Sequence, residues 1–175
     1  ICHPQRFARQ LAFVAAHSEL DVCGSQIDEF EHTPADAAHS RRVPCAHEEI
    51  ARFAKSRNPI NHMTVCYRKS AVLAAGNYQH APLYEDYDLW VRMLLNGCRF
   101  ANLPEVLVYA RAGDEMYRRR GGWAYAKNEL DMQRRFYRAG FLSTAQWAKN
   151  VLLRLPVRLL PNGARQWVYR VLLRK

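Results

Sequence analysis

The chain has 175 residues, of which 49% are hydrophobic, so it is long enough to form one domain with a core of its own. No apolar run approaches the ~18–20 residues of a membrane-spanning helix. The five cysteines are widely spaced and form no CxxC pair, which predicts reduced thiols rather than a disulfide framework or a zinc site.

The whole chain has a net charge of +10, and its positive charge is concentrated in the last third. Residues 1–115 contain 12 Lys and Arg against 14 Asp and Glu, whereas residues 116–175 contain 14 against 2. We therefore expect an α/β part over 1–115, followed by a basic loop and helices over 116–175. The basic composition of the second part predicts an anionic partner.

The first part alternates between helical and extended patterns, which predicts an α/β fold. The first helix begins almost at Ile1, so we expect the chain to be the downstream part of a longer protein. Its apolar stripe contains Phe7, Leu11 and Val14. The predicted elements are helices over 4–17, 46–56, 69–76 and 85–96, strands over 21–30 and 62–68, a loop over 31–45, and two short strand segments around Pro104 within 99–111.

The strand predicted over 62–68 alternates, with Met63, Val65 and Tyr67 on one face and His62, Thr64 and Cys66 on the other. Beyond it, residues 112–122 have the composition of a polar loop. Three helices are predicted to follow, over about 123–138, 143–155 and 164–174.

Three carboxylates stand at the start of the helix predicted over 85–96, in the stretch "YEDYDLW". Acidic side chains in a first turn are stabilised by the helix dipole, which is the ordinary explanation for one or two of them. Asp88 has Arg92 four residues on, so it is predicted to form an ion pair on the helix surface. Asp86 instead precedes Trp90 and Met93 on the apolar stripe. A carboxylate there needs a partner or a ligand, and it can act as a general base for a hydroxyl.

Four blocks of the chain, in order, resemble the downstream half of family 2 glycosyltransferases with the GT-A fold. The resemblance is strongest to bacterial exopolysaccharide and lipopolysaccharide enzymes of the amylovoran-biosynthesis type. The blocks are "PQRFARQLAFVAAHSELDVCGS", "NPINHMTVCYRKSAV", "YEDYDLWVRML" and "NLPEVLVYAR". The fold implied is the acceptor-side α/β part of a GT-A (Rossmann-like) domain, followed by a helical basic tail.

The resemblance implies an inverting transfer from a nucleotide sugar, usually a UDP-sugar, to a hydroxyl of a growing polysaccharide or lipid-linked glycan. The family's aspartate in the "ED" motif is the base, and by motif match this residue is Asp86. Glu85, its motif neighbour, is expected to orient the acceptor or the helix end.

The family also implies a divalent metal, Mg or Mn, on the departing diphosphate, held by an Asp-x-Asp motif. The only such pattern here is Asp86-Tyr87-Asp88, which is the "EDYD" block itself. We therefore predict that these residues contain no metal ligands and lack the donor-binding half. The isolated chain is expected to show little or no transfer.

Several other residues are candidates for contacts with donor or acceptor. His62 and Asn61 follow "NPI" and can line a sugar pocket, although a structural hydrogen-bonding role is the alternative for both. Trp90 can stack on a sugar face or belong to the core. Arg118, Arg119 and Arg120 precede two glycines and can contact the diphosphate, or they form a solvated basic turn.

The tail interleaves Leu, Val and Trp with Arg and Lys, which is typical of helices that lie on an anionic membrane surface. We therefore expect a cytoplasmic protein, with a possible site at the inner face of the plasma membrane, and no nucleic-acid partner. The alternatives left open are a membrane- or nucleic-acid-binding basic module and an inactive truncated remnant.

Overall fold

The computed structural model describes residues 1–37, 39–112, 121–161 and 163–164, and these form two compact units. Unit 1 comprises Ile1–His80 and Glu85–Ala112. Unit 2 combines Ala81–Tyr84 with the described residues after 112. The predicted division at 115/116 falls among residues that are not described. The short return of the chain to unit 2 at 81–84 had no sequence signal.

A mixed four-stranded sheet organises unit 1 around strand β1 (Val22–Phe30). β1 pairs in parallel with β4 (Phe100–Arg111) and antiparallel with β2 (His39–Arg41) and β3 (Cys66–Tyr67). Most of β1 is buried, as expected for a strand that has helices on both faces. The α/β prediction is thus confirmed as a mixed α/β architecture.

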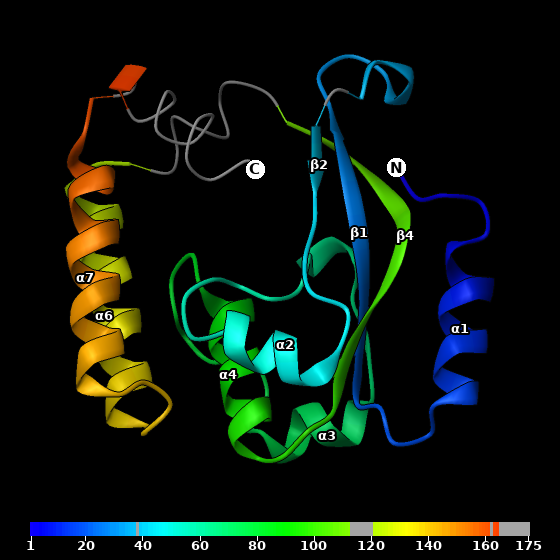
Figure 1. Ribbon diagram of the computed structural model, residues 1–175, viewed down its shortest axis with the longest axis horizontal. Coiled ribbons are helices and arrows are strands. Elements are labelled where there is room, and N and C mark those ends of the chain that lie inside the picture. The colour runs from blue at the N-terminus through cyan, green and yellow to red at the C-terminus, as the bar shows by residue number, and fades with distance from the viewer. Residues whose placement is uncertain (38, 113–120, 162, 165–175) are drawn as a thin grey trace. The chain divides into compact units, whose positions relative to one another are not determined.

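Helices cover both faces of this sheet (Figure 1). On one face, α1 (Arg6–Ala16) packs Phe13 and Val14 against a cluster of Cys23, Leu103 and Leu107. The other face carries the main core, to which the remaining helices of unit 1 contribute. These are α2 (His47–Phe53), α3 (Lys69–Ala74) and α4 (Glu85–Leu95).

The apolar stripe predicted for α1 is only partly correct. Val14 packs on the sheet, but Phe7 and Leu11 are exposed, and the buried residue of the helix is Gln10. The Gln10 amide donates to Thr64 O at 2.7 Å. This polar contact places the face of α1 that carries Gln10 toward the segment beside β1. Periodicity identified the helix correctly but did not determine which stripe is covered.

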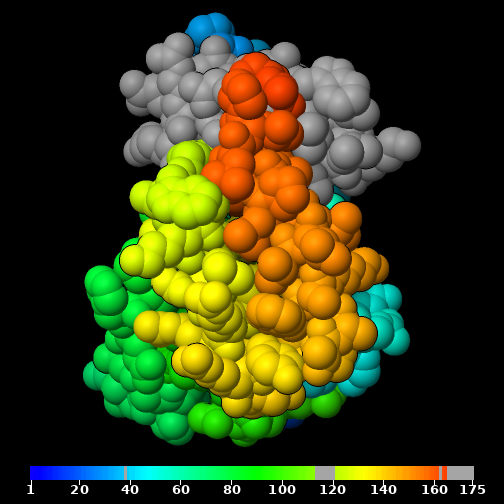
Figure 2. All heavy atoms as spheres, turned by 90° about the vertical axis from the view of Figure 1, so that its left-hand side faces the viewer, coloured from blue at the N-terminus to red at the C-terminus, as the bar shows by residue number. Residues whose placement is uncertain are grey.

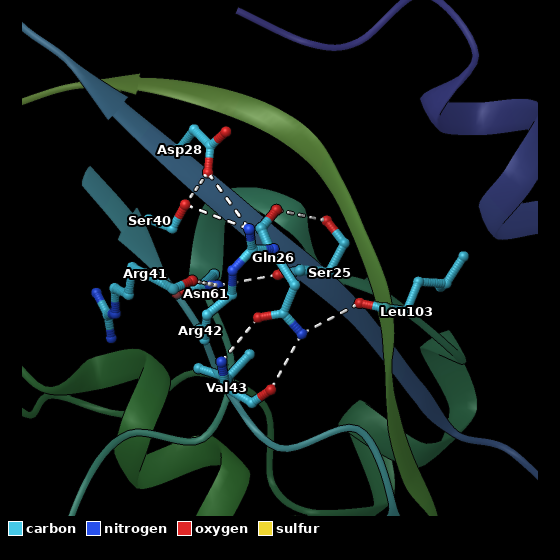
Figure 3. A network of polar contacts seen from close by, with 9 residues as sticks. All are labelled: Ser25, Gln26, Asp28, Ser40, Arg41, Arg42, Val43, Asn61 and Leu103. Carbon is cyan, nitrogen blue, oxygen red and sulfur yellow. Dashed lines mark hydrogen bonds and ion pairs between the residues drawn. The ribbon is translucent and has the colours of Figure 1, made fainter. Parts of the chain in front are cut away.

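β4 is one strand, not the two segments predicted around Pro104. Its register against β1 jumps from Ser25↔Leu103 to Gln26↔Val106, which is a bulge that accommodates the proline. The buried Gln26 side chain bridges the irregularity (Figure 3). Its amide donates to Leu103 O at 3.2 Å and Val43 O at 3.0 Å, and its oxygen accepts from Val43 N at 2.7 Å.

Two further segments differ from the prediction. The expected loop 31–45 contains a 3₁₀ turn (Pro34–Asp36) and β2. The expected strand 62–68 is a 3₁₀ turn (His62–Thr64) followed by β3. Thr64 is fully buried there and donates to Asn61 O at 2.8 Å, whereas Met63 is exposed. A buried hydroxyl that satisfies local backbone groups thus replaced the alternating strand pattern.

In unit 2, α6 (Trp123–Arg138) and α7 (Thr144–Leu159) lie side by side (Figure 2). Gly140, at φ +72°, and the capping box of Ser143 and Gln146 shape the connection between them. The prediction for α6 is confirmed. α7 continues to Leu159 through Pro156 rather than ending at 155. The helix predicted over 164–174 lies outside the described residues, except for its first residue.

We expect Gln26→Ala to reduce the free energy of unfolding by about 3 kcal/mol, because it removes three hydrogen bonds between a buried amide and backbone groups and leaves a cavity. Urea unfolding followed by circular dichroism measures this change. Gln79→Ala, at an exposed position, is the matched control and should change stability by less than about 0.5 kcal/mol. Equal effects of the two substitutions would contradict the bridging role of Gln26.

Candidate active site

The first turn of α4 carries Glu85, Asp86 and Asp88, and the rest of the helix is fixed in the core. Leu89, Trp90 and Met93 are fully buried. The Tyr87 hydroxyl donates to Ala54 O at 2.7 Å, which ties the same turn to the end of α2. The backbone that carries the three carboxylates therefore has little freedom to move within unit 1.

Asp86 is partly buried, with 19% of its side chain exposed. Its Oδ2 accepts a hydrogen bond from Asn58 Nδ2 at 2.8 Å and lies 4.0 Å from His62 Nδ1. Its Oδ1 accepts from the backbone N–H of Tyr87 at 2.7 Å. The carboxylate is thus held in one orientation while part of it stays accessible. This is the arrangement that a general base for an incoming hydroxyl requires.

Asn58 is itself positioned from the sheet. Its own Oδ1 accepts from Ile60 N at 3.2 Å, which turns the amide nitrogen toward Asp86. Asn102 on β4 donates to Pro59 O at 3.1 Å and so fixes the adjacent residue. Gly24 makes room for Asn102, since a Cβ there would stand 2.2 Å from Asn102 Oδ1. The orientation of Asp86 can therefore be traced back to β1 and β4.

Aromatic side chains lie beside His62. Its ring is 6.3 Å from the rings of Tyr78 and Trp90, measured between centroids. Burial raises the pKa of Tyr78 to about 12, and the charges of neighbouring groups, including Asp86, add to this effect. Tyr78 therefore keeps its hydroxyl proton at neutral pH and can act as a hydrogen-bond donor near the carboxylate.

The structure brings Asp86 and His62 together and separates other candidates from them. Asn61 is buried and donates to Ser25 O at 2.9 Å, which is the structural alternative. Trp90 is fully buried in the core, which is the core alternative predicted for it, and it offers no exposed face to a sugar. Glu85 is exposed. Arg118, Arg119 and Arg120 lie outside the described residues.

Asn58 and Tyr78 belong to the site but were not singled out from the sequence. Asn58 stands 28 residues before Asp86, and their contact depends on how α2 and α4 pack. The one available signal was its position at the head of "NPIN", within a block of the family resemblance. Tyr78 follows the turn at Gly76 in a stretch without a periodic pattern.

The ion pair predicted between Asp88 and Arg92 is confirmed, but its surface location is wrong. Arg92 Nε is 2.9 Å from Asp88 Oδ2, and Asp88 is buried. The guanidinium also donates to the carbonyls of Ala75 and Asn77, behind α3. The ion pair therefore connects α4 to the end of α3 and does not lie on the exposed surface of the helix.

A cavity of about 150 Å³ in unit 1 lies beside the start of β1 and is lined by residues that include Val14, Cys23 and Arg68. Its lining includes none of Asn58, His62 and Asp86, so it is not the space that this carboxylate serves. Within the described ranges, no group of three His, Cys, Asp or Glu side chains could hold a metal ion. The described residues therefore do not fit the divalent metal that the resemblance implies.

The same part of the chain has no helix long and apolar enough to cross a membrane. No protein-family model matches the chain.

The chain is similar over nearly its whole length to curated bacterial proteins. It is 42% identical to an uncharacterized glycosyltransferase of Haemophilus influenzae, over 100% of this chain and 65% of that protein. It is 37% identical to the amylovoran biosynthesis glycosyltransferase AmsE of Erwinia amylovora, over 97% of this chain and 63% of the relative. The chain is homologous to bacterial glycosyltransferases.

A further homologous glycosyltransferase is the Escherichia coli UDP-Gal:alpha-D-GlcNAc-diphosphoundecaprenol beta-1,3-galactosyltransferase, at 36% identity over 97% of this chain. The alignment covers 62% of that protein. The 175 residues thus span somewhat less than two thirds of the length of these glycosyltransferases. The predicted likeness to amylovoran-type glycosyltransferases is confirmed.

We expect Asp88→Asn to reduce the free energy of unfolding by about 3 kcal/mol, because removing one charge leaves Arg92 without its buried counter-ion. Chemical denaturation measures this loss. Asp131→Asn breaks an exposed pair with Arg134 and should change stability by about 0.5 kcal/mol or less. A loss as small as that of the control would show that the Asp88 pair behaves as a surface pair.

Proposed function

We propose that the chain is the acceptor-side part of an inverting, family 2 glycosyltransferase with the GT-A fold. Asp86 is its general base. The observation that carries this proposal is the half-buried carboxylate at the start of α4, oriented by Asn58 and the Tyr87 backbone and still accessible. The homology to glycosyltransferases supports the reaction class.

In the proposed reaction, the acceptor hydroxyl oxygen attacks the anomeric carbon of the donor sugar. The bond from that carbon to the diphosphate breaks, and the configuration inverts. Asp86 takes the hydroxyl proton, and the diphosphate leaves with the bonding electron pair. His62 and Tyr78 are placed to donate hydrogen bonds to the acceptor. His62 Nδ1 lies 4.0 Å from the Asp86 carboxylate, and the Tyr78 ring lies 6.3 Å from the His62 ring.

The proposed donor is a UDP-sugar, and the proposed acceptor is a lipid-linked or growing glycan. The name of the Escherichia coli relative gives this kind of pair, UDP-Gal and GlcNAc-diphosphoundecaprenol. A divalent metal would neutralise the leaving diphosphate. Because the described residues offer no ligand set, we propose that the metal and donor sites lie outside these residues. Arg118, Arg119 and Arg120 remain proposed diphosphate contacts.

We expect Asp86→Asn, in the complete product of the gene, to lower kcat at least 100-fold while donor binding stays within twofold of the original. The amide keeps the shape of the side chain but cannot accept the hydroxyl proton. UDP release from a panel of UDP-sugars, with a GlcNAc-diphosphate lipid as acceptor, measures turnover, and calorimetry with UDP measures donor binding. The 175-residue chain alone should show no turnover in this assay.

Asp131→Asn, at an exposed position on α6, is the control for this experiment and should leave kcat unchanged. If the Asp86 variant retained more than a tenth of the activity, the base would have to lie elsewhere.

A membrane surface is the proposed location of the acceptor, at the cytoplasmic face of the plasma membrane. α7 turns its leucines outward, with Leu152, Leu153 and Leu159 exposed by 73%, 62% and 49%. Two of the cations that were expected to contact lipid, Arg154 and Arg158, instead form ion pairs with the buried Glu129. The apolar stripe of α7, within a strongly basic part of the chain, would then insert among anionic lipids.

We expect the double substitution Leu152→Ser/Leu153→Ser to weaken binding to vesicles that contain 30% phosphatidylglycerol by about tenfold or more, because each leucine contributes about 1.5–3 kcal/mol when buried. Co-sedimentation over a range of lipid concentrations measures the change. Leu73→Ser replaces a leucine exposed on α3 and should not alter binding. Unchanged binding of the double variant would remove α7 as the membrane contact.

A further inference from the structure

Two of the five cysteines face each other across the sheet of unit 1. In the antiparallel pairing of β1 with β3, Cys23 lies directly opposite Cys66. A hydrogen bond from Arg68 N to Asp21 O, at 2.8 Å, fixes the register at one end. Residues opposite each other in such a pair have Cα atoms about 4.5–5.5 Å apart, and disulfides join Cα atoms about 4.4–6.8 Å apart. The two backbone positions are therefore spaced as a disulfide requires.

Both thiols lie on the face of the sheet that α1 covers. Cys23 belongs to the cluster beneath that helix. The neighbouring pair turns to the opposite face, where Val22 is part of the main core and the Tyr67 ring is 6.2 Å from the Trp90 ring. Because side chains alternate along a strand, Cys66 shares the face of Cys23.

A side chain of α1 holds the two strands together beside the thiols. The Gln10 amide donates to Cys23 O at 3.5 Å and to Thr64 O at 2.7 Å. Thr64 stands two residues before Cys66, so Gln10 connects β1 with the segment that enters β3. The cysteines therefore face each other in the reduced protein, and a bond between them can form without separating the strands.

The two thiols differ in their access to solvent. Cys23 is buried, whereas Cys66 is half-buried. Both line the cavity of about 150 Å³ beside the start of β1, which gives a small oxidant room to approach them. Burial raises the pKa of the Cys23 thiol to about 12, and the nearby Cys66 thiol adds to this rise. Cys23 therefore stays protonated at neutral pH, and an oxidant is expected to react first at Cys66.

We propose that Cys23 and Cys66 form a redox-active dithiol, which a peroxide converts into a disulfide between β1 and β3. The Cys66 thiolate attacks a peroxide oxygen, the O–O bond breaks, and a sulfenic acid and a hydroxide form. The Cys23 sulfur then attacks the Cys66 sulfur and the S–O bond breaks. Each departing hydroxide takes up one thiol proton. Two thiols and one hydrogen peroxide thus give one disulfide and two molecules of water.

The disulfide would close a covalent loop over residues 23–66, all of which belong to unit 1. The loop contains Asn58 and His62, the two side chains beside the Asp86 carboxylate. Oxidation would therefore restrain the segment that carries these side chains. A closed loop also restricts the unfolded chain, so the oxidised protein should be more stable than the reduced one.

Treatment of the folded gene product with hydrogen peroxide, alkylation of the remaining thiols and tryptic mass spectrometry test the proposal. Each of the five cysteines lies on its own tryptic peptide, with Cys23 on 10–41 and Cys66 on 58–68. We expect these two peptides to be joined about tenfold faster than any other pair, because the thiols already face each other. Dithiothreitol should separate them again. The oxidised protein should melt about 5 °C or more above the reduced protein.

Three results would overturn the proposal. The first is that other cysteine pairs join as fast as this one. The second is that Cys66 stays reduced, or becomes a sulfinic acid while Cys23 stays reduced. The third is that the linked protein melts below the reduced one, because the bond would then not fit the native sheet.

Cys23→Ser removes the thiol that resolves the sulfenic acid, so Cys66 should proceed to the sulfinic acid, which the peptide 58–68 reports as a gain of two oxygen atoms. Equal resistance of Cys66 to this reaction in both proteins would contradict the role of Cys23. Cys45→Ser is the matched control, since Cys45 is half-buried as well, and it should leave the yield of the disulfide unchanged. The linkage in the unsubstituted protein decides the proposal even where Cys23→Ser fails to fold. These measurements do not use transferase activity, so their outcome is independent of the function proposed above.

Discussion

The packing of α4 in the core of unit 1 is the constraint on which the candidate site depends. Trp90, Leu89 and Met93 fill the space between the helix and the sheet, so the helix cannot rotate without opening a cavity. Tyr87 and Arg92 add hydrogen bonds to backbone carbonyls of the two neighbouring helical segments. Asp86 lies beside this packed stripe, so packing contacts of residues that take no part in the proposed reaction fix the direction of its side chain.

One helical turn thus places three carboxylates in three environments. Glu85 faces solvent, where the helix dipole is sufficient to explain it. Asp88 is buried and neutralised by Arg92, which makes it part of the structure. Asp86 lies between these extremes, hydrogen-bonded to an amide and a backbone N–H, with the His62 imidazole 4.0 Å away. Among the three, Asp86 combines hydrogen bonds that orient its carboxylate with partial exposure, and this combination distinguishes the candidate base.

The helices and β1 could be predicted from the sequence, because their apolar residues recur at helical spacing or form a continuous run. The errors occurred where a buried polar side chain outweighed that pattern. Gln26 keeps β4 continuous across Pro104, and Thr64 makes a turn of an apparent strand. The Gln26 bond joins residues 77 positions apart and the Thr64 bond closes a local turn, and neither leaves a periodic trace in the sequence. For the same reason, the aspartate of the site could be proposed from its motif, whereas its partner Asn58 could not.

The helix pair α6 and α7 shows why the charge composition of a segment predicts its partner less well than the positions of its charged side chains. The basic tail predicts an anionic partner, yet two of its arginines are directed at Glu129, one of the two acidic residues after 115. Arg158 lies beyond Pro156, and its pairing with Glu129 helps to explain why the helix continues past a residue that usually interrupts one. With these arginines directed inward, the leucines of α7 are left on the outside. With Arg158 buried and Leu152, Leu153 and Leu159 exposed, α7 is suited to contact an apolar surface, and this arrangement, more than the net charge, supports the proposed contact with a membrane.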